Sequence, residues 1–192
     1  MQLKKLITLL PFFVFTRAFS QWEVSGGGGV AVPITGYGKV VRSGYAFNLD
    51  GRYRLKPHLA TGMRLQVARF ARDKNPTDQF HGAKLTVVPV VFNLEYSFGA
   101  GKLKPYLSGG VGISFFVLSD NSSATAIDDK EIFNVSFTMA PLAGIRYSPH
   151  HHLYACLESG FAILADGPPV GFPMGEKVTG HHFIAVGVGY KF

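Results

Sequence analysis

Apolar side chains occupy every second position at the carboxyl end of this chain. Between residues 184 and 192 the odd positions carry only Ala, Gly or Lys. Because successive side chains of a β-strand point to opposite faces, this spacing predicts a strand with one apolar face. The apolar face suits contact with hydrocarbon, and the face of small and polar residues suits a crowded interior. The apolar positions are Ile184, Val186, Val188, Tyr190 and Phe192.

The amino end predicts a segment that is removed on export. Two lysines precede an apolar run at residues 6–15, and Ala18 and Ser20 then place small residues where a signal peptidase reads. We therefore expect residues 1–20 to be a signal peptide and residues 21–192 to be the mature chain. The apolar run is too short for a membrane-spanning helix, and no later segment has the roughly 18 uninterrupted apolar residues that such a helix needs. If this chain enters a membrane, it must cross it as strands.

An internal repeat divides the mature chain into similar units. Lys56-Pro57 and Lys104-Pro105 each start an alternating run 48 residues apart, and another step of that size reaches His152, where a weaker copy begins. Each unit fits an upward strand, a loop and a downward strand. Four such hairpins give about eight strands, and an even number returns both termini to the same side. The expected units span 21–55, 56–103, 104–151 and 152–192.

The charged side chains lie opposite the apolar face of these strands. A soluble lipocalin-like barrel or sandwich would also alternate, but it would bury the apolar set and expose the charges, and it stays the alternative because alternation alone does not say which face is wet. The charged set is small, which favours an all-β, eight-stranded antiparallel up-and-down transmembrane β-barrel with the charges in its lumen. A lumen filled by mutually compensating ions leaves no wide pore. The side chains expected there are Glu23, Asp50, Arg52, Arg64, Glu95, Arg146, Glu158 and Lys191.

The connections between the expected strands fall into two length classes. With both termini of a barrel in the periplasm, the short connections are periplasmic turns and the long ones are extracellular loops. Short turns are expected at 56–58, 99–102 and 148–151, and long polar stretches at 35–43, 72–84, 119–131 and 166–181.

Composition argues against several other functions. The formal net charge of +7 falls by 3 when the expected signal peptide is removed, so the basic balance does not indicate nucleic-acid binding. Cys156 is the only cysteine, which excludes an intramolecular disulfide and a two-cysteine metal site. Gly26–Gly29 match the glycine pattern of a dinucleotide-binding turn, but they lie inside a strand with no helix after it, so no cofactor is expected.

Histidines are the most reactive side chains outside the expected lumen. His150–His152 could hold a metal, but consecutive strand side chains point to opposite faces and no carboxylate or cysteine is near in sequence. We therefore expect a polar periplasmic turn there and no metal site. His182 lies at the outer end of the last strand, where His81 on a loop could approach it, and Ser159 on the seventh strand shares its outward parity. These three residues are the candidate catalytic positions.

The signal peptide, the alternating strands and the terminal Phe192 resemble small bacterial outer-membrane β-barrel domain proteins of the OmpA/OmpX-like and opacity-protein type. The mature start at Gln21-Trp22 is similar to those of Bacteroidota. The resemblance covers the whole mature chain and implies the bacterial outer membrane as its location, with outer-membrane lipid and lipopolysaccharide around the barrel. It also implies that the barrel-assembly machinery reads Phe192 and the alternating apolar residues before it.

Some small outer-membrane barrels are lipid A deacylases or acyltransferases, whose pattern is implied to place a histidine, a serine and an acid at the outer-leaflet level. A nucleophilic serine needs a base within hydrogen-bond reach and a third group to orient it. This sequence lacks a histidine and a serine two positions apart on one strand face, and Ser159 is expected several residues deeper than His182. We therefore expect a non-enzymatic barrel with an envelope-structural or surface-interaction role through its loops. A lipid-modifying enzyme is the first alternative, and a narrow small-solute channel is the second.

Overall fold

The computed structural model describes residues 21–34, 41–72, 84–119, 132–165 and 179–192. The expected signal peptide lies outside these residues. All regular structure among the described residues is β-strand, and none of it is a helix long and apolar enough to cross a membrane. The strands are β1 (Trp22–Ile34), β2 (Val41–Lys56), β3 (Leu59–Arg72), β4 (Lys84–Ser97), β5 (Leu103–Ser119), β6 (Ile132–Met139), β7 (Leu142–Tyr147), β8 (Leu153–Leu164) and β9 (Thr179–Lys191).

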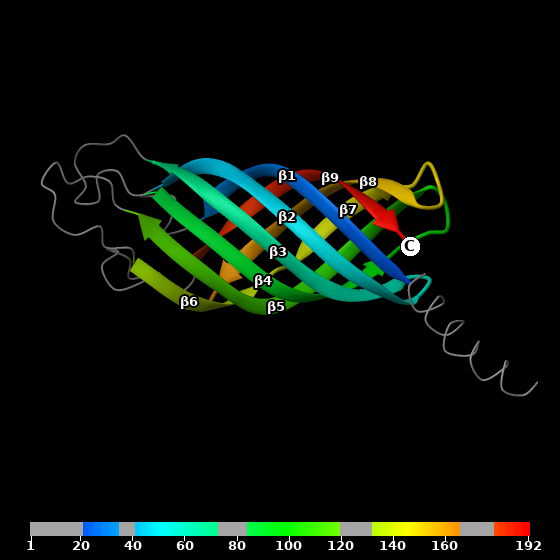
Figure 1. Ribbon diagram of the computed structural model, residues 1–192, viewed down its shortest axis with the longest axis horizontal. Helices are drawn as coiled ribbons and strands as arrows, with labels where there is room; N and C mark the ends of the chain where they lie inside the picture. The colour runs from blue at the N-terminus through cyan, green and yellow to red at the C-terminus, as the bar shows by residue number, and fades with distance from the viewer. Residues whose placement is uncertain (1–20, 35–40, 73–83, 120–131, 166–178) are drawn as a thin grey trace, which may run out of the picture.

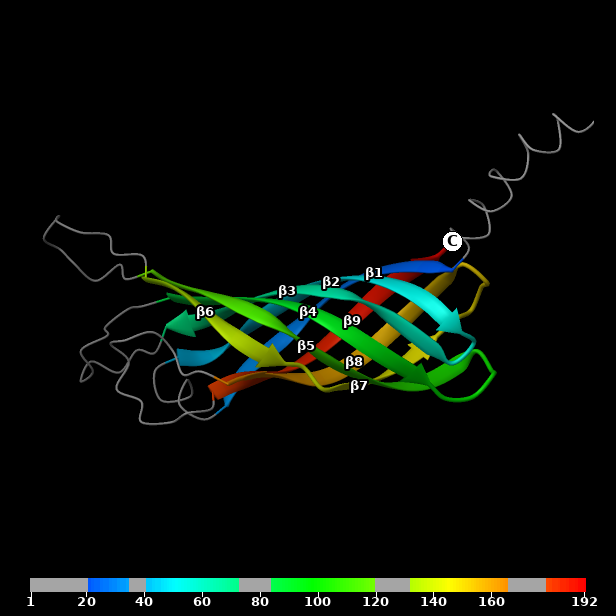
Figure 2. The ribbon, with the colours of Figure 1, turned by 90° about the horizontal axis from the view of Figure 1, so that it is seen from below.

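Strands that follow one another in sequence pair antiparallel, except β6 and β7, and β1 also pairs with β9, which closes the sheet into a barrel (Figure 1). The closing seam runs from Glu23 opposite Lys191 to Ile34 opposite Gly180. A Cβ atom at Gly29 would collide with the carbonyl oxygen of Ile184, so glycine permits the close approach of the first and last strands. Figure 2 shows the strands slanting along the long axis of the barrel.

The strands β6 and β7 occupy one place in the ring, between β5 and β8, and form a single strand interrupted at Ala140 and Pro141. Proline has no N–H to donate to a strand ladder, which explains the interruption. The wall remains bonded there, because Ala140 exchanges two backbone hydrogen bonds with Gly110 and Phe161 donates its N–H to the Pro141 carbonyl at 2.9 Å. The described strands therefore confirm the predicted eight-stranded up-and-down barrel, with one strand in two pieces.

The two ends of the barrel differ as the sequence predicts. Tight turns join β2 to β3, β4 to β5 and β7 to β8 at the end where the carboxyl terminus lies (Figure 1). The four longer connections leave the strands at the opposite end, and most of their residues lie outside the described ranges. The end with the tight turns is the periplasmic end, and the other is the extracellular end.

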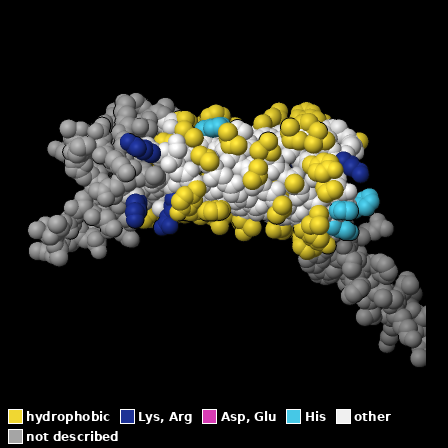
Figure 3. Space-filling model, turned by 90° about the horizontal axis from the view of Figure 1, so that it is seen from above, with side chains coloured by type: hydrophobic (Ala, Val, Ile, Leu, Met, Phe, Trp, Pro, Cys, Tyr) yellow, Lys and Arg dark blue, Asp and Glu magenta, His cyan; other side chains and the backbone are white. Residues whose placement is uncertain are grey.

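The outer face of the barrel is apolar over most of its height. Figure 3 shows hydrophobic side chains covering the middle of the wall, with Lys and Arg side chains near its two ends and no Asp or Glu on the described part of the visible face. Phe92 and Val188 are 67% and 69% exposed, which a water-facing wall would not favour. The four described carboxylates, by contrast, are all buried in the lumen: Glu23, Asp50, Glu95 and Glu158.

The lumen has two parts with different chemistry. Its periplasmic half holds the charged side chains, as predicted from alternation. Its extracellular half holds an apolar cluster beside buried polar side chains such as Ser114, Thr138 and His181. This cluster was not predicted, because only charged side chains were expected in the lumen. The cluster consists of Ala31, Val41, Ala46, Ala68, Phe70, Leu85, Val87, Phe116 and Leu164.

A charge placed on the middle of the outer face tests whether that face contacts lipid. Val186 lies near the middle of β9 and is 64% exposed, whereas Leu55 lies beside the periplasmic end of β2. We expect Val186→Arg to lower the free energy of unfolding in vesicles by about 2–4 kcal/mol and Leu55→Arg by about 0–1 kcal/mol, because the cost depends on depth. Urea titration of both variants measures this, and equal effects would mean that water reaches both positions.

Candidate functional sites: a charged lumen and a serine–histidine pair

The first candidate site is a network of buried ions around Glu95. Arg52 on β2 donates to Glu95 at 2.7 Å, and Arg146 on β7 donates to both carboxylate oxygens of Glu95 at 2.9 and 3.0 Å. Arg52 also donates to the hydroxyl oxygens of Ser25 and, at 2.9 Å, Tyr154. This cluster joins β1, β2, β4, β7 and β8 across the lumen, so it holds opposite walls together.

A second cluster of ions lies beside it, around Arg64 of β3. Arg64 donates through Nε and Nη2 to Asp50 at 2.6 and 3.1 Å, and through Nη2 to Glu158 of β8 at 2.7 Å. The Tyr106 hydroxyl donates to the other oxygen of Glu158 at 2.5 Å, and Asn48 donates to Asp50 at 2.9 Å. The carboxylates of Asp50 and Glu158 therefore each accept hydrogen bonds from two side chains, which offsets much of the cost of removing their charge from water.

The structure places seven of the eight expected lumen charges in buried positions within the two clusters. Lys191 is half-buried, and within the described residues it donates to the Ser148 hydroxyl at 3.2 Å and has no ion pair. Arg54, which was not among the eight, instead pairs with Glu23. Tyr106 and Tyr154, whose hydroxyls bond Glu158 and Arg52, were not among the eight because the expected set consisted of charged side chains.

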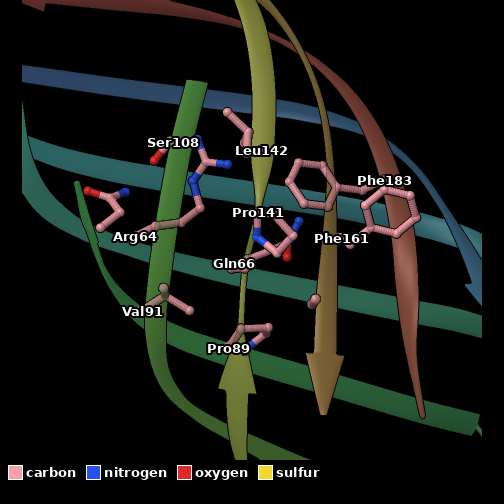
Figure 4. Close-up of a pocket in the computed structure, with 12 residues that line it drawn as sticks. Arg64, Gln66, Pro89, Val91, Ser108, Pro141, Leu142, Phe161 and Phe183 are labelled. Atoms are coloured by element: carbon pink, nitrogen blue, oxygen red, sulfur yellow. The ribbon is translucent and has the colours of Figure 1, made fainter. Parts of the chain in front are cut away.

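A small cavity lies inside the barrel beside Arg64 (Figure 4). It has a volume of about 20 Å³, which is room for about one water molecule. Arg64 and Gln66 from β3, Leu142 from β7 and Phe183 from β9 contribute to its lining.

The second candidate site lies on the outer face, where Ser159 of β8 meets His182 of β9. The register pairs Phe161 with His182 and Ser159 with Ile184, so Ser159 lies two positions deeper than His182, on the diagonal. Its hydroxyl oxygen lies 2.9 Å from His182 Nε2. Ser159 thus lies deeper than His182, as expected, but by only two residues, and side chains of diagonal pairs reach each other across antiparallel strands over that separation.

The surroundings of this pair define what it can do. Ser159 is exposed on the lipid-facing wall, and the His182 ring packs at 4.8 Å from the Phe161 ring. The pair supplies a nucleophile and a base, but none of the described carboxylates can orient the histidine, because all four lie in the lumen. His81, the third candidate residue, lies outside the described residues. The hydrogen bond also satisfies two polar groups that would otherwise face hydrocarbon alone.

The other histidines do not assemble a metal site in the part of the chain that is described. No group of three or more His, Cys, Asp or Glu side chains lies close enough there to hold an ion. His152, from the expected polar turn, uses Nδ1 to bond the Lys191 carbonyl at 2.8 Å and stacks on Tyr190. His181 is fully buried in the lumen, where its Nε2 lies 3.4 Å from Gln66 Oε1.

The residues expected to guide barrel assembly line the outer face of β9. All five are exposed, and the Phe192 N–H donates to the Trp22 carbonyl at 3.0 Å, which ties the last residue to the start of the barrel. Recognition by the assembly machinery stays a prediction. These residues are Ile184, Val186, Val188, Tyr190 and Phe192.

The Glu95 cluster predicts a large loss of stability on removal of one charge. In Glu95→Gln, the guanidinium groups of Arg52 and Arg146 lose their shared anion but stay buried, and we expect the free energy of unfolding to fall by about 3–5 kcal/mol. Ser114→Ala, which removes a neutral buried hydrogen bond to Thr138, serves as the control and should cost about 1 kcal/mol. Urea unfolding followed by the gel shift of the folded barrel measures both, and a Glu95→Gln barrel as stable as the control would contradict the account.

The whole of the barrel resembles known proteins. The chain matches the family described as "Outer membrane protein beta-barrel domain" over residues 6–192. No curated protein sequence matches it. Among solved structures, Neisserial surface protein A superposes with a TM-score of 0.62 at 16% sequence identity, covering 90% of this chain and 97% of that one.

Two further structures share the fold. Ail, the attachment invasion locus protein of Yersinia pestis, gives a TM-score of 0.52 at 18% identity and covers 90% of this chain and 99% of its own. The N-terminal β-barrel domain of Pseudomonas aeruginosa OprF gives 0.51 at 15% identity, with 90% and 98% covered. At these identities the likeness shows the fold alone. The match across nearly all of the chain shows that it belongs to the outer-membrane β-barrel family and that it is located in the bacterial outer membrane.

Proposed function

We propose that this protein is a non-enzymatic outer-membrane barrel that supports the envelope and presents its long extracellular connections for surface interactions. The observation that carries the proposal is the filled lumen. Arg52, Glu95 and Arg146 connect opposite walls in the periplasmic half of the lumen, and the apolar cluster packs in the extracellular half. Such an interior favours a rigid scaffold over a channel, so interactions with other molecules fall to the outer face and the extracellular end.

The solved relatives give this proposal a second support. One is named a surface protein and another an attachment invasion locus protein, and both share this fold. Function on a shared fold depends on local sites, and the long connections of this chain are concentrated at one end of the barrel. An interaction role at the cell surface uses that arrangement directly.

The envelope role predicts a barrier defect that does not depend on Ser159 or His182. Deleting the gene from its host should increase uptake of a hydrophobic fluorescent probe, and both the wild-type protein and a Ser159→Ala/His182→Ala variant should restore the barrier. A third form, with residues 120–131 and 166–178 replaced by short Gly-Ser turns, separates the barrel from the connections. Restoration of the barrier by this form, with loss of cell-surface adhesion, would assign the two roles to different parts of the protein.

The same filled lumen predicts that the refolded protein gives no conductance steps in a planar bilayer. Regular steps of single-channel size would contradict the proposal and favour the small-solute channel, because they require a continuous aqueous path.

A second function is favoured by one specific observation, the 2.9 Å contact between Ser159 and His182 on the outer face, in the extracellular half of the barrel. We propose lipid acyl hydrolysis or transfer as the alternative activity of this pair. Ser159 would attack an ester carbonyl while His182 Nε2 accepts its proton and later returns it to the leaving alcohol. The pair faces the lipid phase, where such esters lie.

Mass spectrometry of lipopolysaccharide and phospholipid tests this alternative after incubation with the refolded protein in mixed micelles. If the pair is catalytic, an acyl chain should be lost or transferred by the wild-type protein, and the rate should fall at least about 1,000-fold in both Ser159→Ala and His182→Ala. Unchanged lipid masses with a folded wild-type barrel would leave the pair as a hydrogen bond that satisfies two polar groups in the membrane.

A further inference from the structure

The wall has a local irregularity at the extracellular end of β2 and β3. Arg42 pairs with Ala71 and Tyr45 with Arg69, so Ser43 and Gly44 share a single opposite residue and form a β-bulge. A Cβ atom at Gly44 would collide with the carbonyl oxygen of Arg69, and only glycine allows the two strands to approach there. The bulge is therefore set by the backbone and does not depend on a side-chain rotamer.

A groove runs over this bulge on the outer face of the barrel. Its floor is apolar, because Val30 and Tyr45 are 54% and 47% exposed there. Polar and cationic side chains form its edges: Ser43, Arg69, Lys84 and Thr86. The groove crosses four neighbouring strands, β1 to β4, and lies away from Ser159 and His182 on β8 and β9.

The cations of the groove lie near the extracellular ends of their strands, where the headgroups of the outer leaflet are expected. Lys84 is the first residue of β4, and Arg69 is close to the extracellular end of β3. Both side chains are exposed, and neither has an ion-pair partner within the described residues. The four described carboxylates are buried in the lumen, so none of them neutralises these two cations on the outer face. Figure 3 shows Lys and Arg side chains and no Asp or Glu at the extracellular end of the visible face.

We propose that this groove binds a phosphorylated glycolipid of the outer leaflet. The Arg69 guanidinium and the Lys84 ammonium bind its phosphate, since charge-assisted bonds to phosphate are strong where water is depleted. The Ser43 and Thr86 hydroxyls add neutral hydrogen bonds to the headgroup. One acyl chain packs on Val30 and Tyr45. A soluble anion would use only the cations, whereas a lipid uses both the cations and the apolar floor.

The experiment titrates lipid A that carries two phosphates into the full-length mature protein held in phosphatidylcholine nanodiscs, and counts bound lipid by native mass spectrometry. We expect one retained lipid A on the wild-type protein. In Arg69→Gln/Lys84→Gln the apparent dissociation constant should rise about tenfold or more, because two charge-assisted contacts are lost.

The matched control is Lys56→Gln/Lys102→Gln, which removes the same charge from exposed positions at the periplasmic end. The control should bind lipid A with the affinity of the wild type. Lipid A without phosphates should bind the wild type weakly, with the affinity that phosphorylated lipid A has for Arg69→Gln/Lys84→Gln, the groove variant. A groove variant with wild-type affinity, or a control that loses as much, would overturn the proposal. Competition by millimolar inorganic phosphate alone would also overturn it, since it would identify a site for a soluble anion. The heat-dependent gel shift shows that each variant is folded.

Discussion

Closure of the sheet is the constraint on which this structure depends. In the hydrocarbon core of a bilayer no water is available to an open strand edge, so each backbone N–H and C=O of the wall needs a partner within the protein. The antiparallel seam between β1 and β9 provides the last set of partners, and glycine at position 29 lets the two backbones meet. Even at Pro141, where one donor is missing, hydrogen bonds to both neighbouring strands persist.

Closure also determines where each side chain goes. Once the ring is complete, strict alternation sends one half of the side chains to lipid and the other half into a narrow interior. Charges in that interior must be paired. Arg64 is an example, because its single guanidinium donates both to Asp50 on the neighbouring strand β2 and to Glu158 on β8. The result is a lumen in which ion pairs connect opposite walls of the barrel.

Alternation allowed much of this arrangement to be predicted from the sequence. The strand count follows from the 48-residue repeat, and parity divides the side chains of each strand between two faces. The small number of charged side chains then assigns residues such as Glu95 to the interior. Parity says nothing about register between strands, so the partners of the lumen charges and the contact of Ser159 with His182 could not be predicted. The bulge at Ser43 and Gly44 was missed for the same reason, and the interruption at Pro141 was passed over although proline marks it.

The central claim is that the apolar face of the wall contacts lipid and the alternate face is closed to both lipid and water. Nitroxide labels placed one at a time at residues 182–192, in a barrel with Cys156 replaced by serine, measure this in vesicles through collisions with oxygen and with a water-soluble nickel complex. The account predicts that oxygen collisions peak at every second residue, at Ile184, Val186 and Val188, and that the nickel complex reaches only the ends of β9. Strong nickel collisions at Val186 would show that the apolar face is wet and would contradict the account.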